Sequence, residues 1–246
     1  MTCTSLPSTL LSWSGGKDAA YALFEILTTH DEDDETIDTK TSAVDDELPV
    51  ALLTLIDDGY DRSKMHGVRR SLYARQADAI GLSIEYLRLP TEPSNEAYEA
   101  AVLAAFERYR ERGVREVVYA DLHLEDVRAY RERLLADTAL DGRWPLWGRD
   151  TRAVVESIID AGFEAILVAV DDDVLDASFA GRTLDERLLE DLPPDVDPAG
   201  EGGEFHTFVI DGPYFDESVP VEIGETVTRP VGDGEFHYCD LLLSDT

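Results

Sequence analysis

Lysine is the scarcest charged residue in this chain of 246 residues, with three lysines against eighteen arginines. Acidic residues outnumber basic ones by 53 to 21, which leaves a formal net charge of −32. A surface this poor in lysine argues against a broad nucleic-acid footprint, because Lys and Arg usually neutralise the phosphates. Dispersed carboxylates instead keep a protein hydrated in a cytoplasm of very high salt, so we expect a halophilic source.

Cysteine and long apolar runs are also lacking. Cys3 and Cys239 form no Cys-x-x-Cys pair, which excludes a zinc ribbon, an iron–sulfur site with ligands from this chain and a dithiol sulfur carrier. There is no run of eighteen apolar residues and no basic-then-apolar leader, so we expect a soluble, cytoplasmic protein without a membrane partner.

Apolar segments alternate with helix-period segments in the first half of the chain. Strands are expected at 9–13, 49–56, 83–89 and 114–120, and helices at 19–27, 68–80, 95–112 and 124–136. This alternation is typical of a parallel sheet with crossover helices. We therefore predict an α/β fold with a doubly wound parallel sheet, in a domain that spans residues 1–143.

Two segments depart from this alternation. Residues 30–48 are rich in Asp, Glu and Thr, which predicts a solvated acidic insertion in the first domain. After Trp144, a helix at 151–161 and a strand at 163–170 precede three β-rich runs at 205–210, 219–228 and 236–243. The sequence thus predicts a smaller C-terminal α+β domain at residues 144–246.

The first candidate site lies at residues 14–18, which read Ser-Gly-Gly-Lys-Asp and join an apolar run directly to a helix. Unpartnered backbone N–H groups converge there with the positive end of the helix dipole, so the turn can hold an anion such as phosphate. Lys17 inside this turn favours binding. The alternative is a glycine-cornered turn without a ligand.

The second candidate site is the sequence Gly-Glu-Gly-Gly-Glu-Phe-His-Thr at residues 200–207, directly before a strand. Glu201, Glu204 and His206 are each suited to acid, base or metal chemistry, and glycines such as Gly203 allow a substrate to approach closely. The alternative is a glycine-rich turn with surface charges.

Other polar residues carry less information. Asp121, at the carboxyl end of the fourth expected strand, is well placed for a ligand. Arg128 is either a partner for a carboxylate or phosphate, through its planar fork, or an exposed helix arginine. His66 and His123 are interpreted as helix caps or surface residues.

The first motif resembles the Ser-Gly-Gly-x-Asp-Ser loop of the PP-loop ATP pyrophosphatases. Together, the two motifs resemble the diphthine–ammonia ligase family of these enzymes. Further segments fall in the family's order and spacing, at 118–122, 126–132, 145–147, 162–170 and 178–182. Ala19 departs from the pattern, since it replaces the final serine of the loop. His206 stands where diphthine ligases carry a glutamate, as in a second branch with relatives associated with corrinoid salvage.

The resemblance implies a Rossmann-like PP-loop fold, with ATP cleaved to AMP and pyrophosphate and with Mg²⁺ held partly by Asp18. The implied ATP-binding residues form the first loop: Ser14, Gly15, Gly16, Lys17 and Asp18. The implied catalytic residues are Lys17, Asp18, Glu201 and Glu204. The implied substrate contacts are Asp121, Arg128, Gly203 and His206.

Three functions stay open from the sequence. The first is an ATP-dependent amide ligase, in which ammonia converts diphthine in elongation factor 2, the implied protein partner, to its amide. The second is a sister enzyme that acts on a small metabolite, as His206 suggests. The third is a nucleotide-binding module without turnover, suggested by Ala19.

Overall fold

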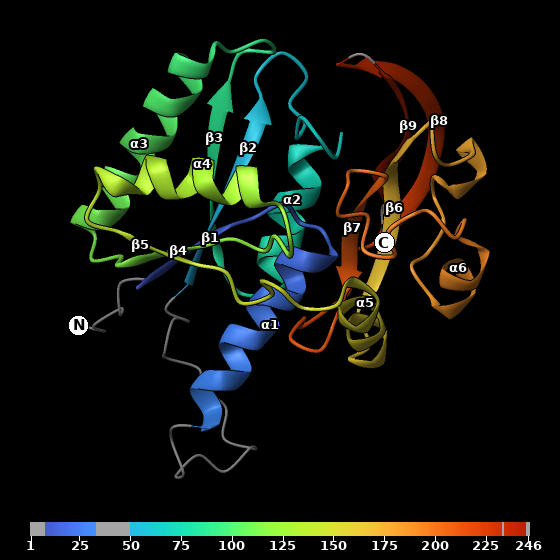
Figure 1. Ribbon diagram of the computed structural model, residues 1–246, viewed down its shortest axis with the longest axis horizontal. Helices are drawn as coiled ribbons and strands as arrows, with labels where there is room; N and C mark the ends of the chain where they lie inside the picture. The colour runs from blue at the N-terminus through green and yellow to red at the C-terminus, as the bar shows by residue number, and fades with distance from the viewer. Residues whose placement is uncertain (1–7, 33–49, 233, 245–246) are drawn as a thin grey trace.

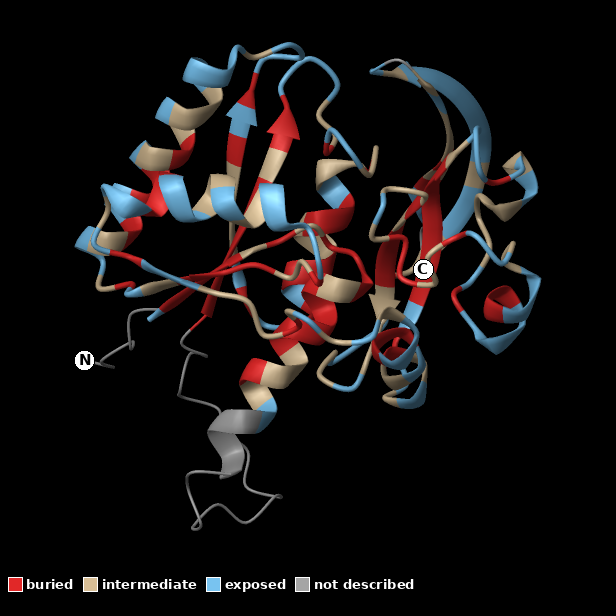
Figure 2. Ribbon diagram, viewed as in Figure 1, coloured by how far each residue is buried: buried red, intermediate tan, exposed pale blue. Residues whose placement is uncertain are grey.

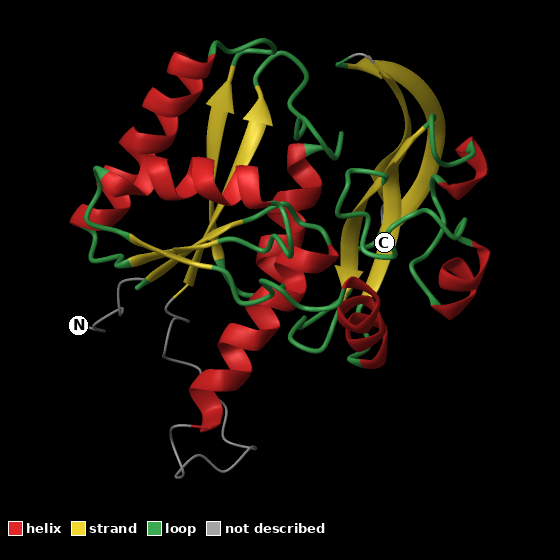
Figure 3. Cartoon of the chain, in the orientation of Figure 1, coloured by secondary structure: helices red, strands yellow, loops and turns green. Residues whose placement is uncertain are grey.

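The computed structural model describes residues 8–32, 50–232 and 234–244. Within these ranges the chain forms two sheets, one five-stranded and parallel, the other four-stranded and antiparallel (Figure 3). We call them the parallel sheet and the antiparallel sheet. No helix in the described ranges is long and apolar enough to cross a membrane.

The parallel sheet has the strand order β3-β2-β1-β4-β5. Its strands are β1 (Thr9–Ser12), β2 (Val50–Asp57), β3 (Ser83–Leu89), β4 (Glu116–Val118) and β5 (Asp141–Arg143). All neighbours pair in parallel, which confirms the predicted α/β fold. The sequence analysis did not predict β5, because this strand has three polar or small residues and no apolar run.

Helices cover both faces of the parallel sheet. On one face lie α1 (Lys17–Glu32) and α2 (Arg70–Ala79), and on the other α3 (Asn95–Glu111) and α4 (Glu125–Ala136). Consecutive residues of β1 point to opposite faces, since Leu11 packs with the first pair of helices and Leu10 with the second. Doubly wound packing therefore explains why these strands read as continuous apolar runs.

The predicted acidic insertion begins later than expected. Helix α1 continues through Glu32, so residues 30–32 belong to the helix. The remainder of the insertion, at 33–48, lies outside the described residues.

The antiparallel sheet has the order β7-β6-β9-β8. Its strands are β6 (Glu164–Asp171), β7 (Phe205–Asp211), β8 (Val221–Val231) and β9 (Gly234–Leu243). The helical segments of this region are α5 (Thr151–Asp160), the short 3₁₀ helix η1 (Ala177–Phe179) and α6 (Glu186–Asp191). Figure 2 shows β6 buried along most of its length and β8 largely exposed, as expected of a central strand and an edge strand.

Helices α1 and α2 lie between the two sheets, and their side chains join both into one hydrophobic core (Figure 1). That core runs from Leu11 in β1 to Phe208 in β7, both fully buried. A division near residue 143 remains a prediction. The parallel sheet ends at Arg143, but residues before and after this point share one hydrophobic core.

The buried side chain of Gln76 ties three elements together. Its Nε2 donates to the carbonyl oxygens of Gly15, at 3.1 Å, and Val209, at 2.6 Å, while its Oε1 accepts from the Trp13 indole at 2.8 Å. Buried polar groups of this kind are stable only when every partner is in place. Gln76 therefore links α2 to the first loop and to β7.

We predict that Gln76→Leu lowers the free energy of unfolding by about 2–4 kcal/mol, because it leaves the indole N–H and two carbonyl oxygens without this partner. The control is Arg75→Leu on the same helix, where a partly exposed pair with Glu217 is lost at a cost of about 1 kcal/mol or less. Urea unfolding in molar KCl measures both. Equal losses in the two variants would contradict the role assigned to Gln76.

Candidate functional site

The two sequence motifs are in direct contact. Strand β7 packs against the turn between β1 and α1, where the Val209 N–H donates to the Gly15 carbonyl at 2.9 Å. Gly15 has a φ of +72°, and a Cβ there would lie 2.7 Å from the Tyr73 ring. A Cβ on Gly16 would lie 3.0 Å from the Thr207 carbonyl oxygen. Gly15 is therefore required by its positive φ and by the close approach of α2, and Gly16 by the close approach of the β7 backbone.

This turn lies where the order of the parallel sheet reverses. The chain leaves β1 toward β2 and β3, then returns to β4 on the other side of β1. Ligands of such sheets bind beyond the carboxyl ends of the strands at this point. Residues 14–18 follow β1 and residues 119–124 follow β4. Because β1 and β4 are parallel neighbours, both loops lie at the same edge of the sheet.

The first amides of the turn point at hydroxyl oxygens. The Lys17 N–H donates to Oγ1 of Thr207 at 3.0 Å, and the Gly16 N–H donates to Oγ of Ser14 at 3.2 Å. Helix α1 begins at Lys17, so these donors lie at the positive end of its dipole. The corner thus has the donor chemistry of an oxyanion site.

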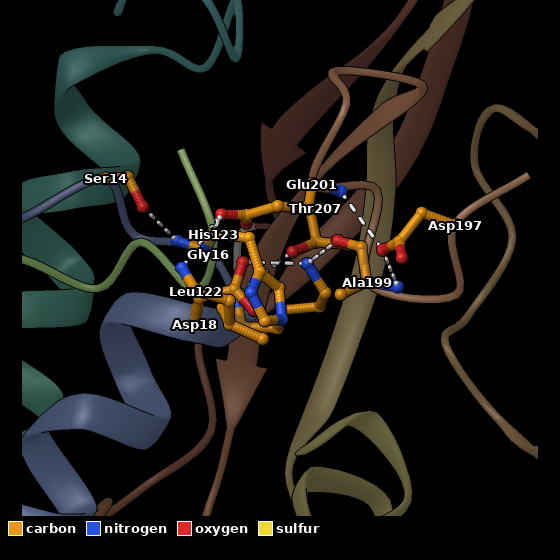
Figure 4. Close-up of polar contacts among 10 residues, drawn as sticks. Ser14, Gly16, Asp18, Leu122, His123, Asp197, Ala199, Glu201 and Thr207 are labelled. Atoms are coloured by element: carbon orange, nitrogen blue, oxygen red, sulfur yellow. Dashed lines mark hydrogen bonds and ion pairs between the residues drawn. The ribbon is translucent and has the colours of Figure 1, made fainter. Parts of the chain in front are cut away.

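The side chain of Lys17 is buried, with 2 % of its surface exposed. Its Nζ donates to Oδ2 of Asp18, at 2.7 Å, and to the carbonyl oxygen of Ala199, and it lies 5.3 Å from the centre of the Phe205 ring. Figure 4 shows residues of the first loop meeting those of 197–207 around this point. The ammonium group therefore joins the two motifs electrostatically.

Glu201 holds the loop after β4. Its Oε1 accepts from the backbone N–H groups of Leu122 and His123, both at 2.8 Å (Figure 4). The Asp197 carboxylate supports this turn, since its Oδ1 accepts from the N–H groups of Ala199 and Glu201. These contacts link the second motif to the parallel sheet, while the predicted catalytic role of Glu201 stays a prediction.

Glu204 has one oxygen engaged and one without a partner. Its Oε1 accepts weakly from the Asp197 N–H at 3.3 Å, while its Oε2 is buried and unpartnered. The neighbouring Gly203 has a φ of +93°, and no described atom lies within 4 Å of the position that a Cβ would take. The space beside this turn is open, as the approach of a substrate requires.

A pair of histidines lies against the same corner. The rings of His66 and His206 are 4.7 Å apart, and Nε2 of His66 lies 3.4 Å from the position of a Cβ on Gly16. Burial, and next the positive charge of Lys17, lower the pKa of His206 to about 4. Burial likewise lowers the pKa of His66 far below its ordinary value. Both imidazoles are therefore neutral near pH 7.

The site thus includes residues that the sequence analysis had not assigned to it. His66 was interpreted as a cap or surface residue, because an isolated histidine before a helix carries no partner signal. Thr207 was not singled out, although this residue directly follows His206 in the second motif. Only the packing of β7 on the turn reveals the contact between Thr207 and Lys17.

Asp121 lies at the carboxyl end of β4, as predicted, and its carboxylate pairs with Arg131 of α4. The Arg131 guanidinium lies 4.4 Å from the centre of the Tyr119 ring. It also lines a cavity of about 90 Å³ between the parallel sheet and helices α3 and α4, with Ser12 and Tyr98 among the other lining residues. Asp121 therefore orients an arginine rather than standing free.

Arg128 packs against aromatic rings. Its guanidinium carbon lies 4.7 Å from the centre of the Trp144 ring and 4.6 Å from that of Trp147, while its Nε donates to Glu132 at 2.8 Å. The residue after Trp147 donates its N–H to the carbonyl of Leu122, in the loop that Glu201 holds. Stacking restricts the guanidinium and leaves its outer N–H edge available to an anion.

Unpartnered polar atoms concentrate at this site. Five buried side-chain polar atoms in the described ranges have no hydrogen-bond partner. Three of them are Oδ1 of Asp18, Oε2 of Glu204 and Nε2 of His206, and the other two belong to Tyr86 and Trp144. Because buried polar atoms are nearly always satisfied, such a concentration points to a ligand.

A metal ion fits this site only in part. No group of three or more His, Cys, Asp or Glu side chains among the described residues is arranged to hold one. Oδ1 of Asp18 nevertheless offers one carboxylate oxygen. Mg²⁺ often takes a single carboxylate and completes its shell with phosphate oxygens and water, so Asp18 would fit such an ion together with a bound nucleotide.

The fold and the site define an α/β protein in which an antiparallel sheet packs against the glycine turn after the first strand. Residues 150–237 match the family model described as diphthamide synthase C-terminal domain. Three relatives named diphthine–ammonia ligase are also similar. The one from Danio rerio is 34 % identical over 93 residues, or 33 % of this chain and 34 % of the relative.

The other two relatives give comparable values. The Schizosaccharomyces pombe protein is 29 % identical over 92 residues, which cover 36 % of this chain and 15 % of the relative. The Bos taurus protein is 34 % identical over 89 residues, which cover 34 % of this chain and 33 % of the relative. The matched stretch therefore spans about a third of two of these relatives and 15 % of the third. These matches confirm the resemblance to the diphthine–ammonia ligase family.

We predict that Glu201→Ala lowers the free energy of unfolding by about 1–3 kcal/mol, because two backbone N–H groups lose their acceptor. Glu201→Gln keeps a carbonyl oxygen at the same place, so it should retain most of the stability. Thermal and urea unfolding measure the difference, with exposed Glu222→Ala of β8 as the control. An alanine variant as stable as this control would show that the carboxylate does not hold the loop.

Proposed function

We propose that the chain is an ATP-dependent amide ligase that resembles diphthine–ammonia ligase and acts in the last step of diphthamide biosynthesis on elongation factor 2. The observation that carries the proposal is the meeting of the two motifs around Lys17, with unpartnered oxygens on Asp18 and Glu204. The names of the three relatives supply the reaction and the acceptor.

In this proposal the chain is a PP-loop enzyme, and the N–H groups of Ser14, Gly15, Gly16, Lys17 and Asp18 bind the β and γ phosphates. A substrate carboxylate attacks the α phosphate, which forms an acyl-adenylate and releases pyrophosphate. Ammonia then displaces AMP and leaves an amide. Lys17 offsets the phosphate charge. Mg²⁺, with Asp18 as a ligand, would supply further screening of that charge.

The remaining residues have proposed roles on the acceptor side. The free Oε2 of Glu204 binds the ammonium ion or accepts a proton from it. The stacked guanidinium of Arg128 binds a substrate carboxylate, while Gly203 and His206 border its approach. Asp121 contributes by orienting Arg131. Glu201 contributes by holding the loop after β4.

A second candidate is a sister enzyme that uses the same ATP chemistry on a small metabolite. It is favoured by the neutral His206, which stands where diphthine ligases carry a glutamate and whose ring lies 4.7 Å from that of His66. A neutral imidazole cannot bind a cationic acceptor as a carboxylate would. The non-catalytic alternative rests on Ala19, which replaces the final serine of the loop. It has less support, because Ala19 is 1 % exposed and its side chain packs into the core, so this position serves packing.

The test uses the purified chain in molar KCl with ATP, Mg²⁺, ammonium and elongation factor 2 that carries diphthine. AMP, pyrophosphate and a diphthamide mass on the factor support the ligase. AMP without a change in the factor favours the sister enzyme. ADP, or no nucleotide product, would rule out the proposed chemistry.

We predict that Glu204→Gln leaves ATP affinity unchanged and lowers the rate of amide formation at least about 100-fold, because the amide side chain cannot accept the ammonium proton. Calorimetry measures ATP binding and mass spectrometry measures the amide. The control is Glu235→Gln at the start of β9. Amide formation at the wild-type rate would make Glu204 a structural residue.

We also predict that Lys17→Met weakens ATP binding about tenfold or more, since a charge-assisted contact to phosphate is lost. Lys64→Met, at an exposed position, is the matched control and should bind as the wild type does. If both variants bind ATP equally well, the Lys17 ammonium serves only its contacts within the protein, with Asp18, Ala199 and Phe205. Their unfolding midpoints separate a loss of affinity from a loss of folding.

A further inference from the structure

The N–H of Lys17, the first residue of α1, has its partner in the antiparallel sheet. It donates to Oγ1 of Thr207 in β7 at 3.0 Å, across 190 residues of sequence. Thr207 is 3 % exposed and Lys17 is 2 % exposed, so water does not replace this contact readily. A hydroxyl oxygen thus occupies the place at this amide where an oxyanion would bind.

The Thr207 hydroxyl accepts a hydrogen bond but donates none among the described residues. A hydroxyl can accept from two donors and also donate its own hydrogen. Here Oγ1 accepts from Lys17, and the contacts of the described residues include no acceptor for its hydrogen. An oxyanion at the Lys17 amide would supply that acceptor.

Two neighbouring atoms point independently to a ligand at the same place. Nε2 of His206, the residue before Thr207, is buried without a partner, and its imidazole is close enough to Lys17 for the ammonium charge to lower its pKa. Oδ1 of Asp18, the residue after Lys17, is also buried without a partner. Unsatisfied buried atoms thus belong to the residue next to each partner of this contact, one in strand β7 and one in helix α1.

We propose that Thr207 is a phosphate-binding residue, so that β7 supplies a hydroxyl donor to the phosphate held by the amides of residues 14–18. This inference rests on the proposed function and extends its nucleotide site to the antiparallel sheet. The Lys17 N–H and the Thr207 hydroxyl already meet at 3.0 Å, so a phosphate oxygen that takes the N–H as its donor could also accept the hydrogen of that hydroxyl. The ligand class is a terminal pyrophosphoryl group, either of ATP or as free pyrophosphate.

The inference changes how the matched C-terminal region is understood. Residues 150–237 include Thr207, His206 and Glu204. If Thr207 contacts phosphate, this region binds nucleotide as well as acceptor. The phosphate then touches the strand that begins directly after Glu204, the residue proposed for ammonia transfer.

The test compares Thr207→Val with Thr207→Ser in the full chain, with calorimetry of ATP, inorganic pyrophosphate and AMP. We expect the valine variant to bind ATP and pyrophosphate about tenfold more weakly, since one hydrogen bond to a charged group is lost. The serine variant should bind both within about twofold of the wild type, and AMP affinity should not change in either variant. A loss for ATP alone would place the hydroxyl near the nucleoside and overturn the assignment to a pyrophosphoryl group.

The matched control is Thr9→Val at the start of β1, where a buried hydroxyl donates to Glu116 instead. It should leave pyrophosphate affinity unchanged. A Thr207→Val variant that binds pyrophosphate as the wild type does, or more tightly, would show that the hydroxyl only caps or competes for the Lys17 amide. If the wild type itself binds neither ATP nor pyrophosphate, the proposed function fails together with the inference.

A second measurement does not depend on the valine variant being folded. With only three lysines, ¹⁵N-lysine labelling gives few backbone signals, and Lys17→Met identifies the one from Lys17. Pyrophosphate should shift this signal in the wild type and in Thr207→Ser. An unmoved Lys17 amide in protein that binds pyrophosphate would overturn the inference.

Discussion

The packing of β7 against the corner between β1 and α1 is the contact on which the rest of the structure depends. It brings a strand within hydrogen-bond distance of Gly15 and Lys17, where Gly16 leaves room for the strand backbone and Gly15 leaves room for Tyr73 of α2. The same glycines make the turn that aims helix amides at an anion. One short segment therefore joins the sheets and, in the proposed function, binds phosphate.

The contact between β7 and the turn is centred on a positive charge, whereas the chain as a whole is strongly negative. In a protein with a net charge of −32, the site is centred on one buried lysine between a carboxylate, a carbonyl oxygen and an aromatic ring. The two histidines beside it are neutral, since a further positive charge would be costly in this buried position. A phosphate group would therefore find a localised positive region in an acidic protein, which favours specific over diffuse anion binding.

Most of the parallel sheet could be predicted because its strands are buried on both faces and read as apolar runs, with amphipathic helices between them. Strand β5 could not, since Asp141 and Arg143 give no apolar signal and pair only because β4 lies beside them. Likewise, β7, β8 and β9 were expected as strands, but their order around β6 depends on contacts between distant segments. The predicted α/β architecture is confirmed, whereas the assignment of site residues stays a prediction.

By itself, the sequence determined most of the helices and strands, the two motifs and the family resemblance, because each depends on local periodicity or on adjacent residues. Only the tertiary structure decided that Lys17 meets Ala199 and Thr207, that Glu201 holds the loop after β4, and that His66 belongs with His206. These pairs are far apart along the chain, so no local pattern encodes them. They form because Gly16 leaves room for the backbone of β7 beside the turn. That steric fit exists only once both sheets have folded.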